Sequence, residues 1–295
     1  MSFLSKLAGL FGSAKRVDLN ERFQLVREAV NGTMSSFHQA IDKTTGKAVG
    51  LKILDTEKTA QFESRFKLLG KPSEGTISLA MKHPRIVETY ETGTLTDGRQ
   101  YLVMEFIQGT VLNTLINQRS PLLNGKRHII IRQMAEAIEA VHKAGYIHRD
   151  ICPRNFIASP DCTEVKLIDF GLTLPASRDF QQPGNRTGTP LYLSPEIVRR
   201  KVTDQRVDIF SYGVSCYQLC TNEFPWPASD VTGRGALQHD SHPPTPITEY
   251  APNLHPTLAK LIMQCIAAEP TSRPPSFEII LKQLKNVNSD DAPKE

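Results

Sequence analysis

The pattern of apolar residues changes near Gly109, and this change limits the possible folds more than any other feature. Before it, short alternating runs and a hairpin with Asp97-Gly98 at its turn predict strands over residues 23–30, 36–42, 48–54 and 93–106. Between these strands, residues 59–81 are helical in composition, with a break near Gly70. After it, helical spacing predicts helices over residues 127–144, 208–219, 258–268 and 276–284. The chain therefore reads as α+β, with a strand-rich lobe, a helical lobe and a cleft between them.

Composition excludes several other classes of protein. The chain has 295 residues, of which 39% are hydrophobic and 22% charged, as in an ordinary globular protein. Its 35 basic and 31 acidic residues are too balanced to indicate a nucleic-acid binder. The five cysteines form no CxxC pair, which predicts reduced thiols and a cytoplasmic protein. Cys216 and Cys220 stand four residues apart in an apolar stretch and are interpreted as helix core.

The two ends of the chain differ from its middle. In the extension 1–19, five apolar residues share one face at helical spacing, with basic residues beside them: Phe3, Leu4, Leu7, Leu10 and Phe11. Two interpretations stay open, namely a helix that touches a membrane through residues 2–16 and a terminus that is frayed or packed on the domain. We expect the main domain over residues 20–285 and a polar tail over 286–295.

The chemistry of the chain is concentrated in one ordered series of polar residues. Asp150 ends the tripeptide His148-Arg149-Asp150, Asn155 follows it, and Asp169 begins Asp169-Phe170-Gly171. One carboxylate can orient a substrate hydroxyl, and carboxylate and amide oxygens are the ligands that Mg²⁺ prefers. Phosphoryl transfer needs such positioning and charge stabilisation more than covalent chemistry. The series therefore favours a phosphoryl-transfer enzyme.

In these residues the chain resembles the eukaryotic-like serine/threonine protein kinases, over about residues 20–285. The matching segments are HRDICPRNF at 148–156, IDFGL at 168–172, GTPLYLSPE at 188–196, DIFSYGV at 208–214 and Arg273 before the last helix. The resemblance implies a bilobal kinase fold, with an N-lobe over about 20–106, a C-lobe over about 107–285 and the active site in the cleft. It also implies Mg-ATP as the phosphate donor and protein Ser/Thr hydroxyls as acceptors.

The resemblance assigns the main roles at the site. Asp150 is implied as the catalytic base, and Asn155 and Asp169 as the ligands of Mg²⁺. Lys52, in Val49-Gly50-Leu51-Lys52, matches the strand lysine that holds the α- and β-phosphates. Its expected partner is Glu74, which stands ten residues before Pro84, while the competing Glu63 lies too early.

The remaining matches concern the hinge and the framework. Glu105 and Ile107 of the hinge segment 104–107 are expected to bind the adenine edge through their backbone. Glu196 and Arg273 match a buried ion pair. Asp208 matches a carboxylate that caps the backbone of the catalytic loop.

The chain departs from the family pattern before the lysine. The three glycine positions of the phosphate-covering loop correspond to Val30, Gly32 and Ser35, so only the middle glycine is kept. Phe37 stands where a valine usually covers the adenine. These four residues stay candidates for nucleotide binding, with an affinity that the altered loop puts in question.

A second departure lies in the catalytic loop and bears on regulation. Cys152 takes the place of the lysine usual in serine/threonine kinases, and Arg154 lies where tyrosine kinases carry an arginine. We interpret Arg154 as stabilising the transferring phosphoryl group. Two interpretations of Arg149 stay open. It either binds a regulatory phosphate on the activation segment, with Thr187 preferred over Ser177 and Thr173 as the acceptor, or only braces the loop. Thr189 is expected to bond near Asp150 and to leave room for small hydroxyl substrates.

Three hypotheses follow. The first is an active serine/threonine kinase with a role in signalling. The second is a pseudokinase that acts as a docking or nucleotide-binding module, for which the altered loop and Cys152 speak. The third is a small-molecule phosphotransferase of related fold, which the long stretch from Gly171 to Glu196 disfavours because it suits peptide substrates.

Overall fold

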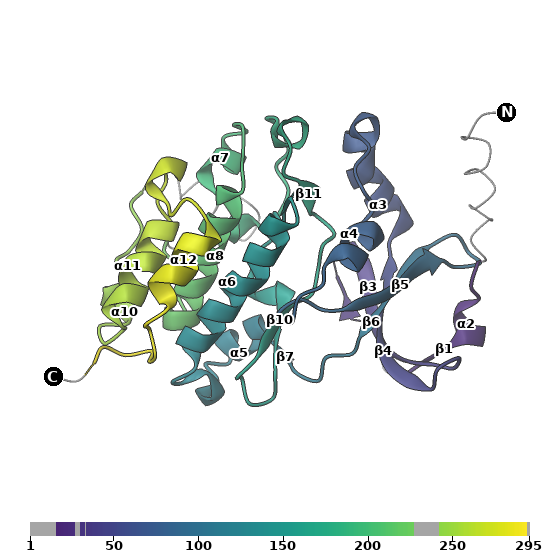
Figure 1. Cartoon of the computed structure of the whole chain (residues 1–295), viewed down its shortest axis with the longest axis horizontal. Helices are drawn as coiled ribbons and strands as arrows, with labels where there is room; N and C mark the ends of the chain where they lie inside the picture. The colour runs from purple at the N-terminus through teal and green to yellow at the C-terminus, as the bar shows by residue number, and fades with distance from the viewer. Residues whose placement is uncertain (1–15, 27–29, 33, 227–241, 294–295) are drawn as a thin grey trace. The chain divides into compact units, whose positions relative to one another are not determined.

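The computed structural model describes residues 16–26, 30–32, 34–226 and 242–293. The predicted membrane-contacting segment therefore lies almost wholly outside the described residues. The described chain forms two compact units, coloured in order along the sequence in Figure 1. The sheet unit comprises residues 16–80 and 88–106, and the helical unit comprises residues 81–87 and 107–293.

The sheet unit is built on an antiparallel sheet in the order β1-β3-β4-β6-β5, with β2 also paired to β3. Its elements are α2 (Leu19–Arg22), β1 (Phe23–Leu25), β2 (Val30–Asn31), β3 (Ser35–Asp42), β4 (Lys47–Leu54), α3 (Thr56–Glu63), the 3₁₀ helix η1 (Ser64–Leu69), α4 (Glu74–Ala80), β5 (Thr89–Thr94) and β6 (Gln100–Glu105). Two described parts of the strand predicted over 23–30 pair with β3: β1 with its second half and β2 with its first.

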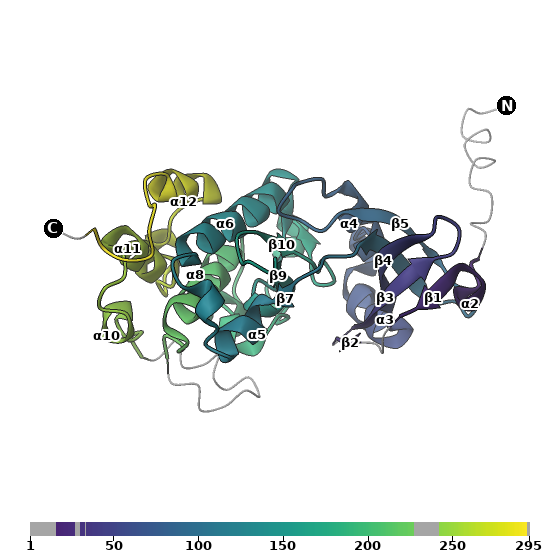
Figure 2. The ribbon, with the colours of Figure 1, turned by 90° about the horizontal axis from the view of Figure 1, so that it is seen from below.

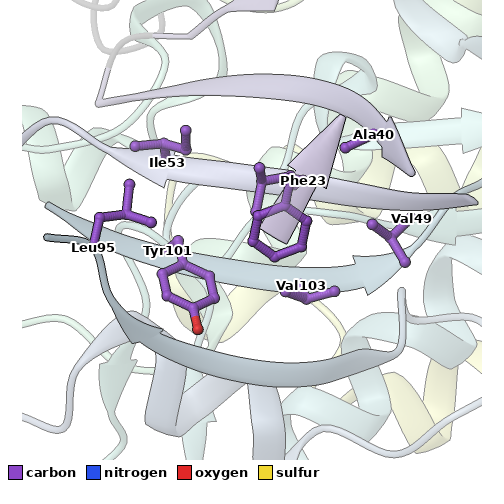
Figure 3. Packing of buried hydrophobic residues seen from close by; sticks show 8 residues of the cluster. Phe23, Ala40, Val49, Ile53, Leu95, Tyr101 and Val103 are labelled. Carbon is purple, nitrogen blue, oxygen red and sulfur yellow. The ribbon is translucent and has the colours of Figure 1, made fainter. Parts of the chain in front are cut away.

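The two faces of this sheet have different roles. Alternation along β4 points Val49, Leu51 and Ile53 to one face, where they pack into a buried cluster (Figure 3). The other members of this cluster are Phe23, Ala40, Leu95, Tyr101 and Val103. Gly50 and Lys52 alternate with these residues and therefore belong to the opposite face.

The helical part of the sheet unit is interrupted as the sequence predicts. Gly70, with φ of 63°, ends η1 in a left-handed conformation that suits glycine. The first helix starts at Thr56 rather than near residue 59, because the Asp55 carboxylate accepts a hydrogen bond from Lys58 N at 3.0 Å and caps it. Figures 1 and 2 both show α4 beside β5.

The helical unit contains the predicted long helices and short strands between them. Its elements are β7 (Thr110–Val111), α5 (Leu112–Asn117), η2 (Pro121–Leu123), α6 (Arg127–Lys143), β8 (Tyr146–Ile147), η3 (Pro153–Asn155), β9 (Phe156–Ala158), β10 (Val165–Leu167), β11 (Leu174–Pro175), η4 (Arg178–Gln181), η5 (Pro190–Tyr192), α7 (Pro195–Val198), α8 (Arg206–Thr221), α10 (Ile247–Tyr250), α11 (Pro256–Cys265), η6 (Pro270–Ser272) and α12 (Phe277–Leu284). All four predicted helices are confirmed, with ends shifted by up to three residues.

Helix α8 forms the centre of this unit. Every residue from Val207 to Leu219 is buried, which explains why apolar residues are not confined to one face of the helix. Helix α11 packs on α8, and α12 packs on α6 (Figure 1). Cys216 lies in the buried part of α8 and Cys220 in its last turn, as predicted.

The residues after the last helix pack against the helical unit. Val287 and Asp290 are buried, and Asp290 Oδ1 accepts hydrogen bonds of 2.8 Å from both the backbone and the ring of His128. The segment after α12 therefore stays attached to the helical unit up to Ala292, whose backbone N–H donates to the Asn253 carbonyl at 2.8 Å. Among the described helices, none has the length and apolar character needed to cross a membrane.

Candidate active site

Asp150 is held by donors on both oxygens of its carboxylate. Oδ1 accepts hydrogen bonds from Thr189 N and from Thr189 Oγ1, each at 2.8 Å. Oδ2 accepts one from Asn155 Nδ2 at 3.0 Å. A carboxylate has about four acceptor positions, so these bonds fix its direction and leave capacity for a further hydroxyl. The sequence expectation that Thr189 bonds near Asp150 is met in this geometry.

The residue before Asp169 is hydrogen-bonded to Asn155 through the backbone. Strand β10 ends at Leu167, and Ile168 N donates to the Asn155 carbonyl at 3.0 Å. Asn155 Nδ2 donates to Asp150 O at 2.7 Å as well as to the carboxylate, so the amide oxygen is turned away from Asp150. Gly171 N donates to Asp169 Oδ1 at 2.8 Å. The helical unit thus presents oriented oxygen donors, which suit Mg²⁺.

Asp208 braces the loop that carries the base. Its carboxylate accepts hydrogen bonds of 2.8 Å from the backbone N–H groups of His148 and Arg149 and from His142 Nε2. Burial alone would raise the pKa of Asp208, but the bond from His142 and the neighbouring backbone donors outweigh burial and lower it. The buried carboxylate therefore stays charged, as the predicted loop cap requires.

Arg149 points into the activation segment. It is buried with φ of 69°, and its guanidinium donates to the Asn185 carbonyl at 2.8 Å and to Thr203 Oγ1 at 3.3 Å. Burial lowers the pKa of Arg149, while the charge of Asp208 opposes this shift. The hydroxyl of Thr187 donates to Asn185 Oδ1 at 3.2 Å, so this candidate phosphoacceptor lies beside the residue that Arg149 binds.

The two other candidate acceptors differ from Thr187 in exposure. Ser177 is exposed, whereas Thr173 is fully buried and bonds to the His148 carbonyl at 3.4 Å. Because Thr173 is buried, another enzyme cannot reach its hydroxyl in this conformation.

Cys152 and Arg154 both lie beside Thr189. Arg154 is exposed and its Nη2 donates to Thr189 Oγ1 at 2.9 Å, while Cys152 Sγ lies 3.7 Å from the same hydroxyl. Burial raises the pKa of the Cys152 thiol to about 11, with the nearby Asp150 charge adding to the effect. The thiol is therefore neutral at physiological pH, and Arg154 supplies the positive charge next to Thr189.

In the sheet unit, the predicted partner of Lys52 is Glu74. Lys52 Nζ forms a buried ion pair with Glu74 Oε1, and both side chains are less than a tenth exposed. Ser73 Oγ accepts a hydrogen bond from Thr76 N at 3.2 Å and caps α4, so Glu74 lies in the first turn of the helix. Glu63 lies instead near Lys71 and raises its pKa, although burial outweighs it and lowers that pKa overall.

The segment in place of the glycine-rich loop is a tight hairpin. Gly32 N donates to the Ser35 carbonyl at 2.8 Å, and Val30 pairs with Phe37 across β2 and β3. Phe37 is the cross-strand neighbour of Lys52, and its ring lies over Gly50. A β-carbon at position 50 would come within 2.9 Å of Phe37 Cζ. The large residue at 37 and the glycine at 50 therefore compensate each other in volume.

The hinge candidates Glu105 and Ile107 lie on either side of the boundary between the two units in the sequence. Glu105 is the last residue of β6, its backbone N–H donates to the Glu88 carbonyl at 2.9 Å, and its Oε1 accepts from Glu88 N at 2.8 Å. Ile107 is the first residue of the longer segment of the helical unit. The backbone N–H of Glu105 is thus engaged within the sheet unit.

The expected framework pair is present in the helical unit. Arg273 donates to both Glu196 oxygens at 2.7 and 2.8 Å, and both residues are buried. Its guanidinium also donates to the carbonyls of Ala267, Ala268 and Arg206.

Two hydrogen-bond partners of these residues were not predicted from the sequence. His142 bonds to Asp208, and Thr203 bonds to Arg149. Each is separated from its partner by more than fifty positions, so no local spacing could have indicated the contact.

Comparison with known proteins agrees with this geometry. A family model described as the protein kinase domain matches residues 23–284. The chain therefore belongs to the protein kinase family, and the predicted α+β kinase fold is confirmed.

Two curated proteins of similar sequence are named as serine/threonine-protein kinases. The serine/threonine-protein kinase pkn3 of Myxococcus xanthus is 30% identical over 275 residues, covering 88% of this chain and 48% of the relative. The serine/threonine-protein kinase PknB of Mycolicibacterium smegmatis is 30% identical over 287 residues, covering 93% of this chain and 44% of the relative. The chain spans less than half the length of these relatives.

Proposed function

We propose that this chain is a serine/threonine protein kinase that transfers the γ-phosphate of Mg-ATP to protein hydroxyls. The observation that carries the proposal is the arrangement around Asp150, whose carboxylate is oriented by Thr189 and Asn155. In this role Asp150 accepts the proton of the attacking hydroxyl as the base. The names of the similar proteins support the same activity.

The other site residues have matching roles in this proposal. Lys52, held by Glu74, binds the α- and β-phosphates, and Arg154 spreads the charge of the transferring group. The nucleotide lies against the hairpin residues Val30, Gly32, Ser35 and Phe37, and its base bonds to the backbone at Glu105 and Ile107.

Asn155 and Asp169 are the residues that would hold Mg²⁺. Among the residues that the structure describes, no three His, Cys, Asp or Glu side chains cluster as a metal cage. A cation at Asn155 and Asp169 would therefore complete its shell with phosphate and water oxygens, which is how Mg²⁺ is usually held beside nucleotides. When bound, the ion neutralises charge on the phosphates.

Regulation and partners complete the proposal. Phosphate on Thr187 would lie close to the Arg149 guanidinium, which now binds the neighbouring Asn185 carbonyl. The partners are proteins with accessible Ser or Thr hydroxyls, and the protein acts in the cytoplasm. Membrane contact through residues 2–16 stays a prediction from sequence. So do the domain limits 1–19, 20–285 and 286–295.

Transfer of radiolabel from ATP tests the function. The purified chain is incubated with γ-labelled Mg-ATP and mixed proteins, and in parallel with sugars and aminoglycosides. Label on serine or threonine after acid hydrolysis, lost on addition of a chelator, is the expected result. Mg-ATP binding without any transfer would favour the docking module instead. Label confined to the small molecules would indicate a small-molecule phosphotransferase.

A further inference from the structure

Helix α4 lies unusually close to the sheet at one position. Gly75 is buried against Thr92 of β5, and a β-carbon at position 75 would lie 2.4 Å from Thr92 Oγ1 and 2.9 Å from its Cβ. These distances are far shorter than the 3.4 Å of an ordinary contact. Only glycine permits this approach of the helix to the strand.

Thr92 cannot easily turn away from Gly75. Its hydroxyl donates to the Tyr101 carbonyl on β6 at 3.0 Å, which fixes the side chain in place. A larger residue at position 75 would therefore push the helix outward by about 1 Å, the difference between 2.4 Å and an ordinary 3.4 Å contact.

The register of the sheet connects this contact to the Lys52–Glu74 pair. Leu102 of β6 pairs with Thr92 on one side and with Lys52 on the other, so all three side chains share a face. Thr92 and Lys52 are two strands apart, or about 10 Å. Glu74 directly precedes Gly75 in the helix and forms the ion pair with Lys52.

We propose that Gly75 is a positioning residue, whose seat on Thr92 sets the height of α4 above the sheet and thereby holds Glu74 against Lys52. The inference rests on the proposed function, since it assigns the pair to phosphate binding. The two charged partners are buried, so a small outward shift of α4 separates Glu74 from Lys52 in a place where breaking an ion pair is costly. Displacements near 1 Å can lower an enzymatic rate by about 10²-fold.

The test uses Gly75→Ala, with Thr76→Ala as the matched control. Thr76 lies in the same turn but is exposed, so its alanine meets no neighbour on the sheet. We expect kcat/KM for ATP to fall by about 10- to 100-fold in Gly75→Ala and to change less than about twofold in Thr76→Ala. Lys52 labelling by a water-soluble acylating reagent, without nucleotide, should rise severalfold in Gly75→Ala alone.

Rescue separates positioning from simple damage. Thr92→Gly removes all three Thr92 atoms that a β-carbon at 75 would meet. The double variant Gly75→Ala/Thr92→Gly should therefore return to the rate and Lys52 labelling of Thr92→Gly alone. Should Gly75→Ala fail to fold, the double variant should regain a cooperative thermal transition.

Two results would overturn the inference. One is unchanged Lys52 labelling and ATP kinetics in Gly75→Ala, and the other is a double variant no better than Gly75→Ala. If the parent chain transfers no phosphate, the proposed function fails, but the labelling experiment still decides the positioning role.

Discussion

At the scale of single residues, the hydroxyl of Thr189 connects the proposed base to a positive charge. It donates to Asp150 Oδ1 and accepts from Arg154 Nη2, which uses its donor and one acceptor position. The neutral thiol of Cys152 packs beside it. Arg154 therefore places a positive charge on the hydroxyl that binds Asp150, while position 152 carries a neutral thiol.

Removing this charge should slow transfer without unfolding the protein. We expect Arg154→Ala to lower kcat by about 10-fold or more, because the guanidinium stabilises charge on the transferring group and orders Thr189. Arg154→Lys should retain part of the rate. Steady-state kinetics at saturating ATP measures the effect, with exposed Arg65→Ala as the control. A rate within about twofold of the parent would make Arg154 an ordinary surface residue.

At the scale of elements, α8 organises the loop that carries Asp150. Its first turn contributes Asp208, whose three hydrogen bonds tie the loop backbone and His142 of α6 to one buried carboxylate. The pKa of Asp208 in the folded chain lies below its ordinary value of 3.8. A depressed pKa means that the stabilisation is fully present above the unfolded value and is lost as pH falls through the folded one.

The variant Asp208→Asn tests how far the stability of the fold depends on pH through this carboxylate. We expect a loss of roughly 2–4 kcal/mol in the free energy of unfolding at pH 7, since the amide cannot accept all three bonds. The parent should lose stability as the pH falls below about 4, and the variant should lose less over the same range. Urea unfolding at several pH values measures both. Equal pH dependence in the two proteins would contradict the assignment.

A second element-scale link joins α7 to the segment before α12. The bidentate pair of Glu196 and Arg273 is buried, and Arg273 also satisfies three carbonyls. Glu196→Ala should therefore cost about 3–5 kcal/mol in urea unfolding, because it leaves a buried guanidinium unpaired. The double variant Glu196→Ala/Arg273→Met should lose less than the sum of the single losses. A cost below about 1 kcal/mol would show that the pair is dispensable.

At the scale of the whole molecule, the sequence predicted the elements better than their tight contacts. Periodicity predicted β3, β4 and the long helices, because burial on one face leaves a pattern in the chain. The Asp97-Gly98 turn predicted the β5–β6 hairpin, although β5 begins at Thr89, before the predicted start at residue 93. The resemblance to the kinases, through the spacing to Pro84 that it implies, selected Glu74 over Glu63, and the ion pair with Lys52 is formed by Glu74. The pairing of β1 and β2 with opposite halves of β3, by contrast, leaves no local signal in the sequence.

What the sequence could not show are contacts that depend on register and distance. Gly75 looks like a weak point in a helix, and only the position of Thr92 across the sheet explains it. Gly50 likewise becomes understandable only beside Phe37. Asp290 looks like part of a polar tail, yet it is buried against His128, 162 positions earlier.

The most direct test of the account is the rate of γ-phosphate transfer by Asp150→Asn beside that of the parent. The variant keeps the shape of the side chain but lacks the negative charge that accepts the hydroxyl proton. We predict a fall of about 10²-fold or more in kcat, several kcal/mol of transition-state stabilisation, with a thermal transition within a few degrees of the parent. Equal phosphorylation by the two proteins would contradict the account.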